Sequence, residues 1–302
     1  MRISTNTIYQ SGTNQLMNLQ SDLNKLSIQT ATGKRVNTPA DDPVAAARIL
    51  ELNTAKDLNT NYGNTRKTAE TLLQTYESNL TSVTDTIQSI QSSLIAAGNG
   101  SYSNNEREKL ANELQGQLDT LKGLANTKDS QGNYLYAGYA TATVPFDNSY
   151  NFVANTSRTK LQVDVQSQLS VTFTGDQVFG ANGSNVFNNL QDIIALLKTP
   201  ITDSTTQATF STGLATSIDN MQDSLNRVLN TRSEIGSSLN LVDTLNTTGD
   251  SLDLQYDESI SKLQDLDYAQ ALSDISKKTT ILQAAQKAFV ATSNISLFSL
   301  IS

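Results

Sequence analysis

Regularly spaced apolar residues mark the two ends of the chain. In residues 14–32, Leu16, Leu19, Leu23 and Leu26 recur at steps of three and four. In residues 268–302 the same kind of spacing runs through Tyr268, Leu272, Ile275, Thr279, Leu282 and Phe289. Such spacing lines one face of a helix, and a period of 3.5 residues favours a partner helix. Because helices depend mostly on packing an apolar face, we predict that the two runs pair with each other or with copies in neighbouring molecules.

Helical periodicity also fills most of the chain between these ends. It extends from Pro43 to Ala97, is broken by Gly98-Asn99-Gly100, and returns where Ser103 and Glu106 form a capping-box pattern. The long seam of the first segment is predicted to be Leu58, Tyr62, Thr65, Ala69, Leu72, Tyr76, Leu80, Val83, Ile87, Ile90 and Leu94. A second helical stretch runs over Val186–Leu197, and a third after Pro200 with Phe210, Leu214, Ile218, Met221, Leu225, Val228, Ile235, Leu239 and Val242.

The period changes from helical to two in the middle of the chain. Apolar and polar residues alternate over 161–165 and 169–173, with Gln166-Ser167-Gln168 between them, which predicts an antiparallel hairpin. Several tyrosines and phenylalanines of residues 131–187 are expected to fill a small core there. Because this segment is inserted between two helical stretches, we expect it to project from them and to tolerate deletion of about residues 135–183.

These patterns predict a mainly α fold of long antiparallel helical rods, coiled-coil-like and formed by the N- and C-terminal parts, with a small inserted β domain. The predicted domains are a terminal helical assembly domain (1–36 and 268–302), a helical rod domain (37–130 and 188–267) and the inserted β domain (131–187). The order of these elements along the chain is then symmetric, so both termini are expected at the same end of the rods.

The stretch that follows the first helix contains several strong local signals. Gly33 suits the left-handed position after a helix, and Asp42-Pro43 suits a helix start, where Asp caps free amides and Pro fits the first turn. Every residue type between them is explained if the stretch is a connector.

Composition excludes several kinds of chemistry. The 302 residues include no Cys and no His, which removes disulfides, thiolate chemistry and imidazole acid–base catalysis, and argues against a zinc site. Helix capping explains Asp41-Asp42, and Asp129–Asn133 is a turn because it lacks the glycine and glutamate positions of a calcium loop. Gly175–Gly180 lacks the ending of a phosphate loop. We therefore expect no enzyme, cofactor or metal.

Charge is distributed unevenly. Residues 1–36 and residues 275–302 each carry a net charge of +3, whereas the total is −8, so the part between carries −14. This balance disfavours nucleic-acid binding. Acids gather before and at the start of the last helix: Asp250, Asp253, Asp257, Glu258, Asp265, Asp267 and Asp274. They form either a solvated helix face or contacts to the basic ends of neighbouring copies.

No stretch approaches the ~20 apolar residues of a membrane span, and the first residues lack the apolar core of a signal peptide. The protein is therefore expected either to stay inside the cell or to leave by a route that reads no cleavable signal.

Several motifs resemble the flagellin superfamily. They are Met1–Thr5, Thr32–Val36 with Pro39–Ala45, and Leu266–Ala269. Tyr134–Gly138, Gly175–Phe179 and the ending Leu297-Phe298 are more similar to members at the junction of hook and filament than to flagellin, although the closing Ser299–Ser302 matches imperfectly.

The resemblance implies a structural protein of the bacterial flagellum, secreted by the flagellar type III apparatus and forming a ring of identical subunits between hook-associated protein 1 and the flagellin filament. It also implies an export chaperone at the C-terminal end. We predict that the assembly interface comprises Leu16, Leu19, Leu23, Leu26, Leu272, Ile275, Leu282, Phe289, Leu297 and Phe298. Two alternatives are a filament subunit, that is flagellin itself, and an enzyme or adhesin carried on a helical stalk.

Overall fold

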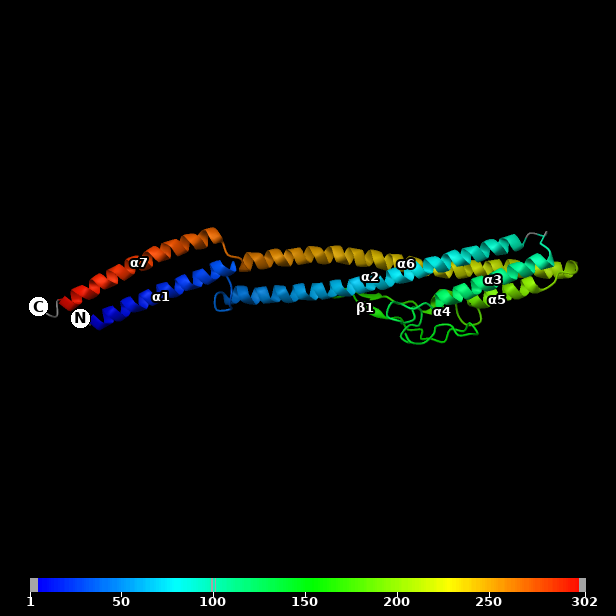
Figure 1. Ribbon diagram of the computed structural model, residues 1–302, viewed down its shortest axis with the longest axis horizontal. Coiled ribbons are helices and arrows are strands. Elements are labelled where there is room, and N and C mark those ends of the chain that lie inside the picture. The colour runs from blue at the N-terminus through cyan, green and yellow to red at the C-terminus, as the bar shows by residue number, and fades with distance from the viewer. Residues whose placement is uncertain (1–4, 99, 101, 299–302) are drawn as a thin grey trace. The chain divides into compact units, whose positions relative to one another are not determined.

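A computed structural model describes residues 5–98, 100 and 102–298, with side chains other than those of residues 5, 6, 8 and 292–298. The mainly α prediction is confirmed (Figure 1). The helices are α1 (Thr5–Thr32), α2 (Pro43–Ala97), α3 (Asn104–Ala125), α4 (Gly175–Phe179), α5 (Val186–Lys198), α6 (Ser204–Gln264) and α7 (Tyr268–Phe298). The strands are β1 (Lys160–Gln162) and β2 (Gln168–Ser170). None of these helices combines the length and the apolar character that a membrane crossing requires.

The chain divides into two compact units. Unit 1 comprises Met1–Asn59 and Asp250–Ser302, and unit 2 comprises Thr60–Gly249, so α2 and α6 each run from one unit into the other. The division into three domains stays a prediction.

In unit 2 the buried face of α2 has a strict heptad period. Its buried residues follow at alternating steps of four and three: Ala69, Leu73, Tyr76, Leu80, Val83, Ile87, Ile90, Leu94 and Ala97. Within unit 2 the predicted seam is therefore wrong at one position, since Leu73 is fully buried and Leu72 is only partly buried against the core. With Leu73 in place of Leu72, the two successive steps of four in the predicted seam, from Leu72 to Tyr76 and from Tyr76 to Leu80, disappear. Leu58, also placed in the seam, is 45% exposed.

The facing side of α6 keeps the same period with many small polar residues. Hydroxyl residues seven apart, Ser217, Ser224, Thr231 and Ser238, alternate with apolar ones such as Met221 and Val228 on the buried face. The first three donate a hydrogen bond to the carbonyl four residues earlier, at 2.8–3.1 Å, so their polar groups are satisfied inside the helix. The sequence reading missed these positions because it followed apolar residues alone.

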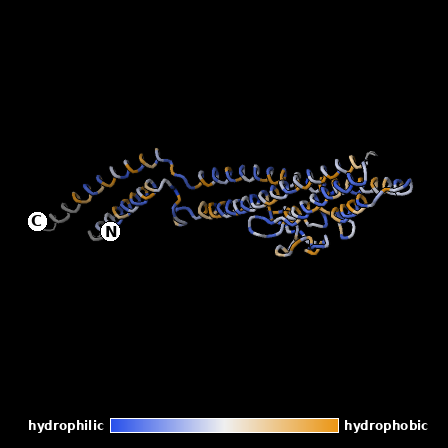
Figure 2. The backbone as a smooth tube through the Cα atoms, turned by 45° about the vertical axis from the view of Figure 1, so that its right-hand side comes forward, coloured by the Kyte–Doolittle hydropathy of each residue, from blue (hydrophilic) through white to orange (hydrophobic). Residues whose placement is uncertain are grey.

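Side-chain contacts show that α2 and α6 run antiparallel in unit 2. Arg66 Nε donates to Asn246 at 2.7 Å, and Arg232 pairs with Glu77 at 2.6 Å. The α3 and α5 helices pack against each other beside them. Hydrophobic residues recur along α2, α3, α5 and α6 (Figure 2).

The segment between α3 and α5 holds the predicted hairpin, with shorter strands than expected. Leu161 pairs with Leu169 in an antiparallel register, and the turn already begins at Val163. Val165, expected in the strand, is in that turn and is 64% exposed. Asp129 begins a turn, as predicted, and Asp147 begins a second one. In both turns the Asp Oδ1 accepts from the backbone N–H groups two and four residues further on, at 2.8 and 2.9 Å.

Aromatic residues join this segment to the helices of unit 2. Tyr136 lies edge-on to Tyr76 of α2, with ring centroids 5.4 Å apart, and Phe146 lies 4.8 Å from Phe187 of α5. Tyr136 donates to Asn79 at 2.7 Å, and burial raises its pKa, so the phenol stays neutral. The aromatics therefore belong to one continuous core and not to a small separate one. Because deleting 135–183 would expose this face of α2, the structure favours a destabilising effect of the deletion over the expected tolerance.

Several predicted helix ends are confirmed. Ser103 and Glu106 form the reciprocal capping box of α3. Asp42 Oδ1 accepts from the Ala45 N–H at 3.0 Å where α2 begins, and Gly33, with φ +71°, follows the last residue of α1.

Candidate assembly interface

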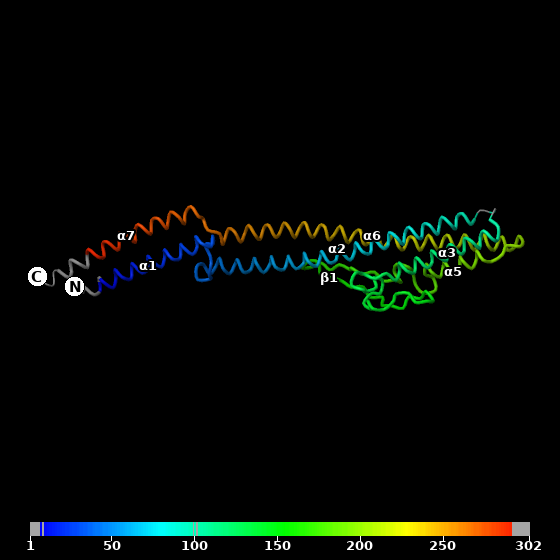
Figure 3. The backbone as a smooth tube through the Cα atoms, viewed as in Figure 1, coloured from blue at the N-terminus to red at the C-terminus, as the bar shows by residue number. Residues whose placement is uncertain are grey.

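In unit 1, α1 and α7 lie side by side as an antiparallel pair (Figure 3). Lys278 of α7 pairs with Asp22 of α1 at 2.6 Å. The rings of Tyr9 and Phe289 lie 5.1 Å apart near the other end of the pair. Of the two possibilities that the sequence left open, partner helix in the same chain or in a neighbour, the first is therefore realised in this structure.

The predicted interface residues are distributed unevenly over this pair. Leu282 is buried, whereas the four leucines of α1, Ile275 and Phe289 are half-buried. These residues line the contact within one chain, so their faces are already partly covered. The side chains of Leu297 and Phe298 lie outside the described residues. That the predicted interface residues contact neighbouring subunits stays a prediction.

Leu272 differs from the other predicted residues because it is 55% exposed. Val290, five helical turns further on, is 58% exposed and falls at the same angle around α7. On α1, Met17 and Ile28 are similarly exposed and nearly aligned. The pair thus carries apolar side chains on surfaces that face away from its internal contact. In the sequence, these residues form a second line of apolar positions along each helix. The prediction missed them because it considered a single apolar seam per helix.

Backbone hydrogen bonds join the end of α1 to the connection between α6 and α7. The Leu266 N–H donates to the Gly33 carbonyl at 3.0 Å, and the Arg35 N–H donates to the Gln264 carbonyl at 2.6 Å. Arg35 also donates through Nη2 to the Leu263 carbonyl at 2.7 Å. We call residues 33–42, which follow α1, the junction loop. It therefore tethers the two distant ends of the chain.

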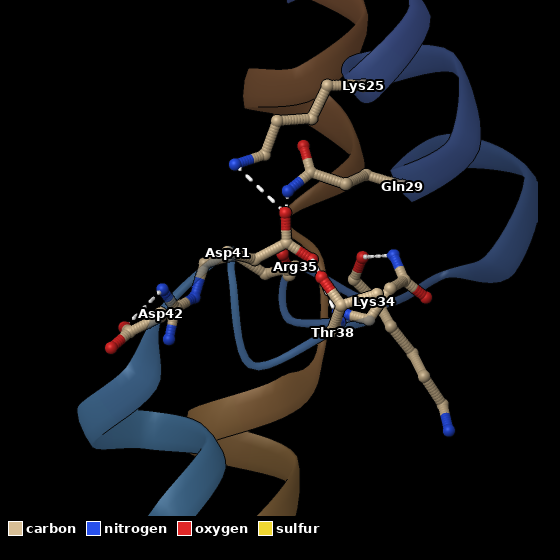
Figure 4. Close-up of polar contacts among 8 residues, drawn as sticks. Lys25, Gln29, Lys34, Arg35, Thr38, Asp41 and Asp42 are labelled. Atoms are coloured by element: carbon tan, nitrogen blue, oxygen red, sulfur yellow. Dashed lines mark hydrogen bonds and ion pairs between the residues drawn. The ribbon is translucent and has the colours of Figure 1, made fainter.

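Asp41 organises the junction loop internally (Figure 4). Its Oδ2 accepts from the N–H groups of Asn37 and Thr38 at 3.1 and 2.9 Å, and its Oδ1 lies 2.9 Å from Lys25 Nζ of α1. The Lys25 ammonium, followed by the Thr38 N–H, holds the pKa of the Asp41 carboxyl well below its ordinary value. The carboxylate is the charged form that these donors require.

Asp42 has a second role in the same loop. One oxygen caps α2 and the other lies 3.1 Å from Arg35 Nη1. The cap on the Ala45 N–H, and then Arg35, lower the pKa of Asp42. Beneath these contacts Val36, Ala45 and Ile49 form a small apolar cluster, covered by Ile260 and Leu263 of α6. The stretch is a connector, as predicted, but it also fastens both ends of the chain, which local signals did not reveal.

The acidic run is largely used within the chain. Asp257 pairs with Lys56, Glu258 pairs with Lys262, and Asp267 caps α7 by accepting from Ala269 and Gln270. The carboxylates of Asp253, Asp265 and Asp274 accept hydrogen bonds from Asn59, Ser261 and Gln270. Contacts inside the chain therefore favour the first explanation, a partly solvated helix face. In the described part of the chain, no three potential metal ligands gather.

A helix pair formed by the two ends of the chain, together with two long antiparallel helices and a small insertion between them, is typical of flagellin-like structural proteins. The family model "Bacterial flagellin N-terminal helical region" matches residues 3–141. The flagellar hook-associated protein 3 of Escherichia coli (strain K12) is 36% identical over 315 residues, which is 99% of each chain. At this identity and coverage, the chain belongs to the flagellar hook-associated protein 3 family, and it is a structural component of the bacterial flagellum.

Solved structures agree with this fold. A flagellar hook-associated protein from Vibrio parahaemolyticus has a TM-score of 0.68 at 23% identity, covering 74% of this chain and 100% of its own. The flagellar junction protein FlgL from Legionella pneumophila has a TM-score of 0.64 at 18% identity, covering 72% of this chain and 100% of its own.

Proposed function

We propose that this chain forms the ring that joins hook-associated protein 1 to the flagellin filament. The observation that carries the proposal is the similarity to a hook-associated protein 3 over 99% of both chains, which includes both terminal helices. The Legionella protein that shares the fold is named a junction protein. Both terminal helices are the parts whose patterns first indicated assembly.

The terminal pair is the proposed assembly surface. Leu272, Val290, Met17 and Ile28 are each more than half exposed, although all are apolar. Exposed apolar stripes of this kind indicate surfaces that a partner covers. Neighbouring copies would cover them within the ring, and identical subunits in head-to-tail contact close such rings. Hook-associated protein 1 and flagellin would contact the two faces of the ring.

Export by the flagellar type III apparatus, with a chaperone on the C-terminal end, belongs to the same proposal. The small apolar core of unit 1 supports it, because a chain segment with little buried apolar surface unfolds at low cost for passage through a channel. The three-domain division proposed from the sequence would then separate assembly helices, rods and insertion.

A pair of neighbouring substitutions tests the assembly surface. Leu272→Asp puts a charge on the exposed stripe, whereas Ser273→Asp puts the same charge on the next exposed residue of α7. In cells that lack the native protein, Ser273→Asp should restore swimming and Leu272→Asp should not, because a carboxylate in a covered apolar contact is costly to desolvate. Normal swimming with Leu272→Asp would remove this stripe from the interface.

The place of the protein in the flagellum requires a second measurement. The sequence has no cysteine, so Val165→Cys on the exposed turn gives a single labelling position. A thiol-reactive dye should mark one spot where the hook meets the filament. Labelling along the whole filament would identify the chain as a filament subunit instead.

A further inference from the structure

An asparagine side chain joins the loop before α5 to the inserted segment of unit 2. Asn182 Oδ1 accepts a hydrogen bond from the Phe152 N–H at 2.6 Å, and Asn182 Nδ2 donates to the Phe152 carbonyl at 3.2 Å. Both ends of the side-chain amide are therefore paired with the backbone of one residue, as they would be with a neighbouring strand. We call these two hydrogen bonds the amide bridge.

The amide bridge holds a residue of the aromatic core. Phe152 is 9% exposed, and its ring lies 5.6 Å from that of Phe146, with which it also forms an antiparallel backbone bridge. The ring is tightly packed on another side, since a Cβ atom at Gly175 would lie 2.9 Å from it. Asn182 thus attaches an exposed loop to the core of unit 2.

The residue after Asn182 is a glycine in an exposed turn. The Ser184 N–H donates to the Ala181 carbonyl at 3.1 Å, and Gly183 has φ +85°, so residues 181–184 form a β-turn. All four residues are exposed, and nothing lies within 4 Å of a Cβ atom built at Gly183. Water therefore has access to the turn.

An asparagine followed by glycine can lose its side-chain amide in water. The backbone nitrogen of the glycine attacks the asparagine Cγ, the bond from Cγ to Nδ2 breaks, and ammonia leaves, which gives a cyclic succinimide. Water then opens the ring to aspartate or isoaspartate. Glycine favours the attack because it has no Cβ atom to obstruct the approach. The sequence contains two such dipeptides, Asn182-Gly183 and Asn99-Gly100, and Asn99 lies outside the described residues.

The amide bridge opposes this reaction in the folded chain. The leaving group is Nδ2 of Asn182, which the Phe152 carbonyl holds, and the carbonyl oxygen beside it accepts from the Phe152 N–H. Both hydrogen bonds must break before ammonia can leave. Two hydrogen bonds of ordinary strength reduce the open population about 10- to 100-fold.

The product cannot form the same bridge. An ionised aspartate has acceptors only, so its second oxygen would face the Phe152 carbonyl oxygen with no hydrogen between them. Isoaspartate also lengthens the backbone of the turn by one carbon. Opening of the loop therefore becomes permanent once the amide is lost.

We propose that Asn182 is a deamidation site controlled by the amide bridge. It reacts when the loop leaves Phe152, and its conversion prevents the loop from fastening to the inserted segment again.

Peptide mapping by mass spectrometry measures the reaction in the full chain, kept at mildly alkaline pH either folded or in urea. Trypsin leaves Asn182 in residues 161–198 and Asn99 in residues 68–107, so the two dipeptides are quantified separately. In urea both should convert at similar rates. In the folded chain Asn182 should convert about 10- to 100-fold more slowly than in urea. Equal rates at Asn182 in the folded and unfolded chains would overturn the proposal.

Two glycine variants test whether Phe152 controls the rate. Gly175→Ala displaces the Phe152 ring and should speed the conversion of Asn182 in the folded chain. Gly116→Ala in α3, where nothing lies within 4 Å, should leave the rate unchanged. Circular dichroism establishes that each variant is folded. An unchanged rate in folded Gly175→Ala would show that the reaction does not depend on Phe152.

A charge variant tests the consequence of the reaction. Asn182→Asp reproduces the aspartate product, which is ionised at neutral pH, and it should raise amide exchange in residues 150–155 several-fold. Ser184→Asp places the same charge on another exposed residue of the turn and should leave that exchange unchanged. Unchanged exchange in Asn182→Asp would overturn the claim that conversion keeps the loop open.

Discussion

The two units of this chain distribute their apolar residues in opposite ways. Of the 44 buried apolar residues among those described, 39 belong to Thr60–Gly249 and five to unit 1. Of the 19 large apolar residues that are exposed, 12 belong to unit 1, although it is the smaller unit. Unit 2 therefore has a core of its own, whereas unit 1 has apolar surface left for partners.

The comparison teaches that a similar seam spacing can serve two purposes. In α2 the heptad face is fully buried, with Leu73, Leu80 and Ile87 inaccessible to solvent. In α1 the leucines on a comparable face remain half-buried, because a single helix, α7, covers them. Helical spacing predicts a partner helix in both cases, but the number of covering elements decides how stable the result is.

The largest effect is expected from a cavity in the aromatic core of unit 2. Phe179 contacts the rings of Tyr136, Phe146 and Phe187, and it is almost fully buried. Phe179→Ala should lower the free energy of unfolding by about 3–5 kcal/mol. Calorimetry would detect this as a shift of the main transition, whereas Val165→Ala should leave that transition in place. A shift below about 1 kcal/mol would show that unit 2 lacks a rigid aromatic core.

Overpacking the same core should have a smaller effect. A Cβ at Gly175 would lie 2.7 Å from the Phe146 ring and 2.9 Å from that of Phe152. Gly175→Ala should therefore destabilise unit 2 by about 1–3 kcal/mol. The matched control is Gly116→Ala in α3, where nothing lies within 4 Å, and there the change should stabilise by up to about 1 kcal/mol. Denaturant unfolding of both variants shows directly whether the free energy of unfolding falls in one and rises in the other.

A core substitution in unit 1 should leave the melting of unit 2 almost unchanged. Leu282 is the buried leucine of α7, and it lies in unit 1. Leu282→Ala should speed amide exchange throughout α1 and α7, because few other buried residues hold this pair. The main calorimetric transition should move by less than about 0.5 kcal/mol. Parallel loss of protection in α3 and α5 would show that the units do not unfold independently.

The smallest effect is expected from acid at the junction loop. Because the folded-state pKa of Asp41 is lowered from an ordinary 3.8, its stabilisation is complete above about pH 4 and is lost as pH falls through the folded value. Amide exchange of the loop should therefore rise at acid pH, while exchange in unit 2 changes less. Asp41→Asn should raise amide exchange in the loop at neutral pH and should remove the further rise at acid pH. Unchanged exchange in this variant would mean that the contacts of Lys25 and Thr38 with the Asp41 carboxylate do not stabilise the loop.

Local chemistry in the sequence was sufficient for much of the fold. Asp42-Pro43, Ser103 with Glu106 and Gly33 marked helix ends correctly, because caps depend on a few neighbouring residues. Failures arose where distant parts of the chain meet. Leu72 and Leu73 are adjacent and both apolar, so only the packing of other elements on α2 selected Leu73.

The candidate interface shows the same limit. Sequence spacing identified the faces of α1 and α7, but Leu272 and Leu282 fit the pattern equally well, and only the paired helices distinguish the exposed from the buried one. Likewise, a Cβ atom at Gly12 of α1 would lie 2.7 Å from the ring of Phe289, a residue 277 positions away in the chain, and no local pattern indicates this contact.

The sequence by itself determined the helical segments, their ends, the inserted hairpin and the absence of thiol and imidazole chemistry, because periodicity, capping and composition act locally. Tertiary structure decided that the inserted aromatics share the core of α2, that the junction loop joins the end of α1 to the start of α7, and that the ring of Phe289 packs against Gly12. These depend on groups far apart in the chain, whose approach is fixed by the summed packing of the whole unit.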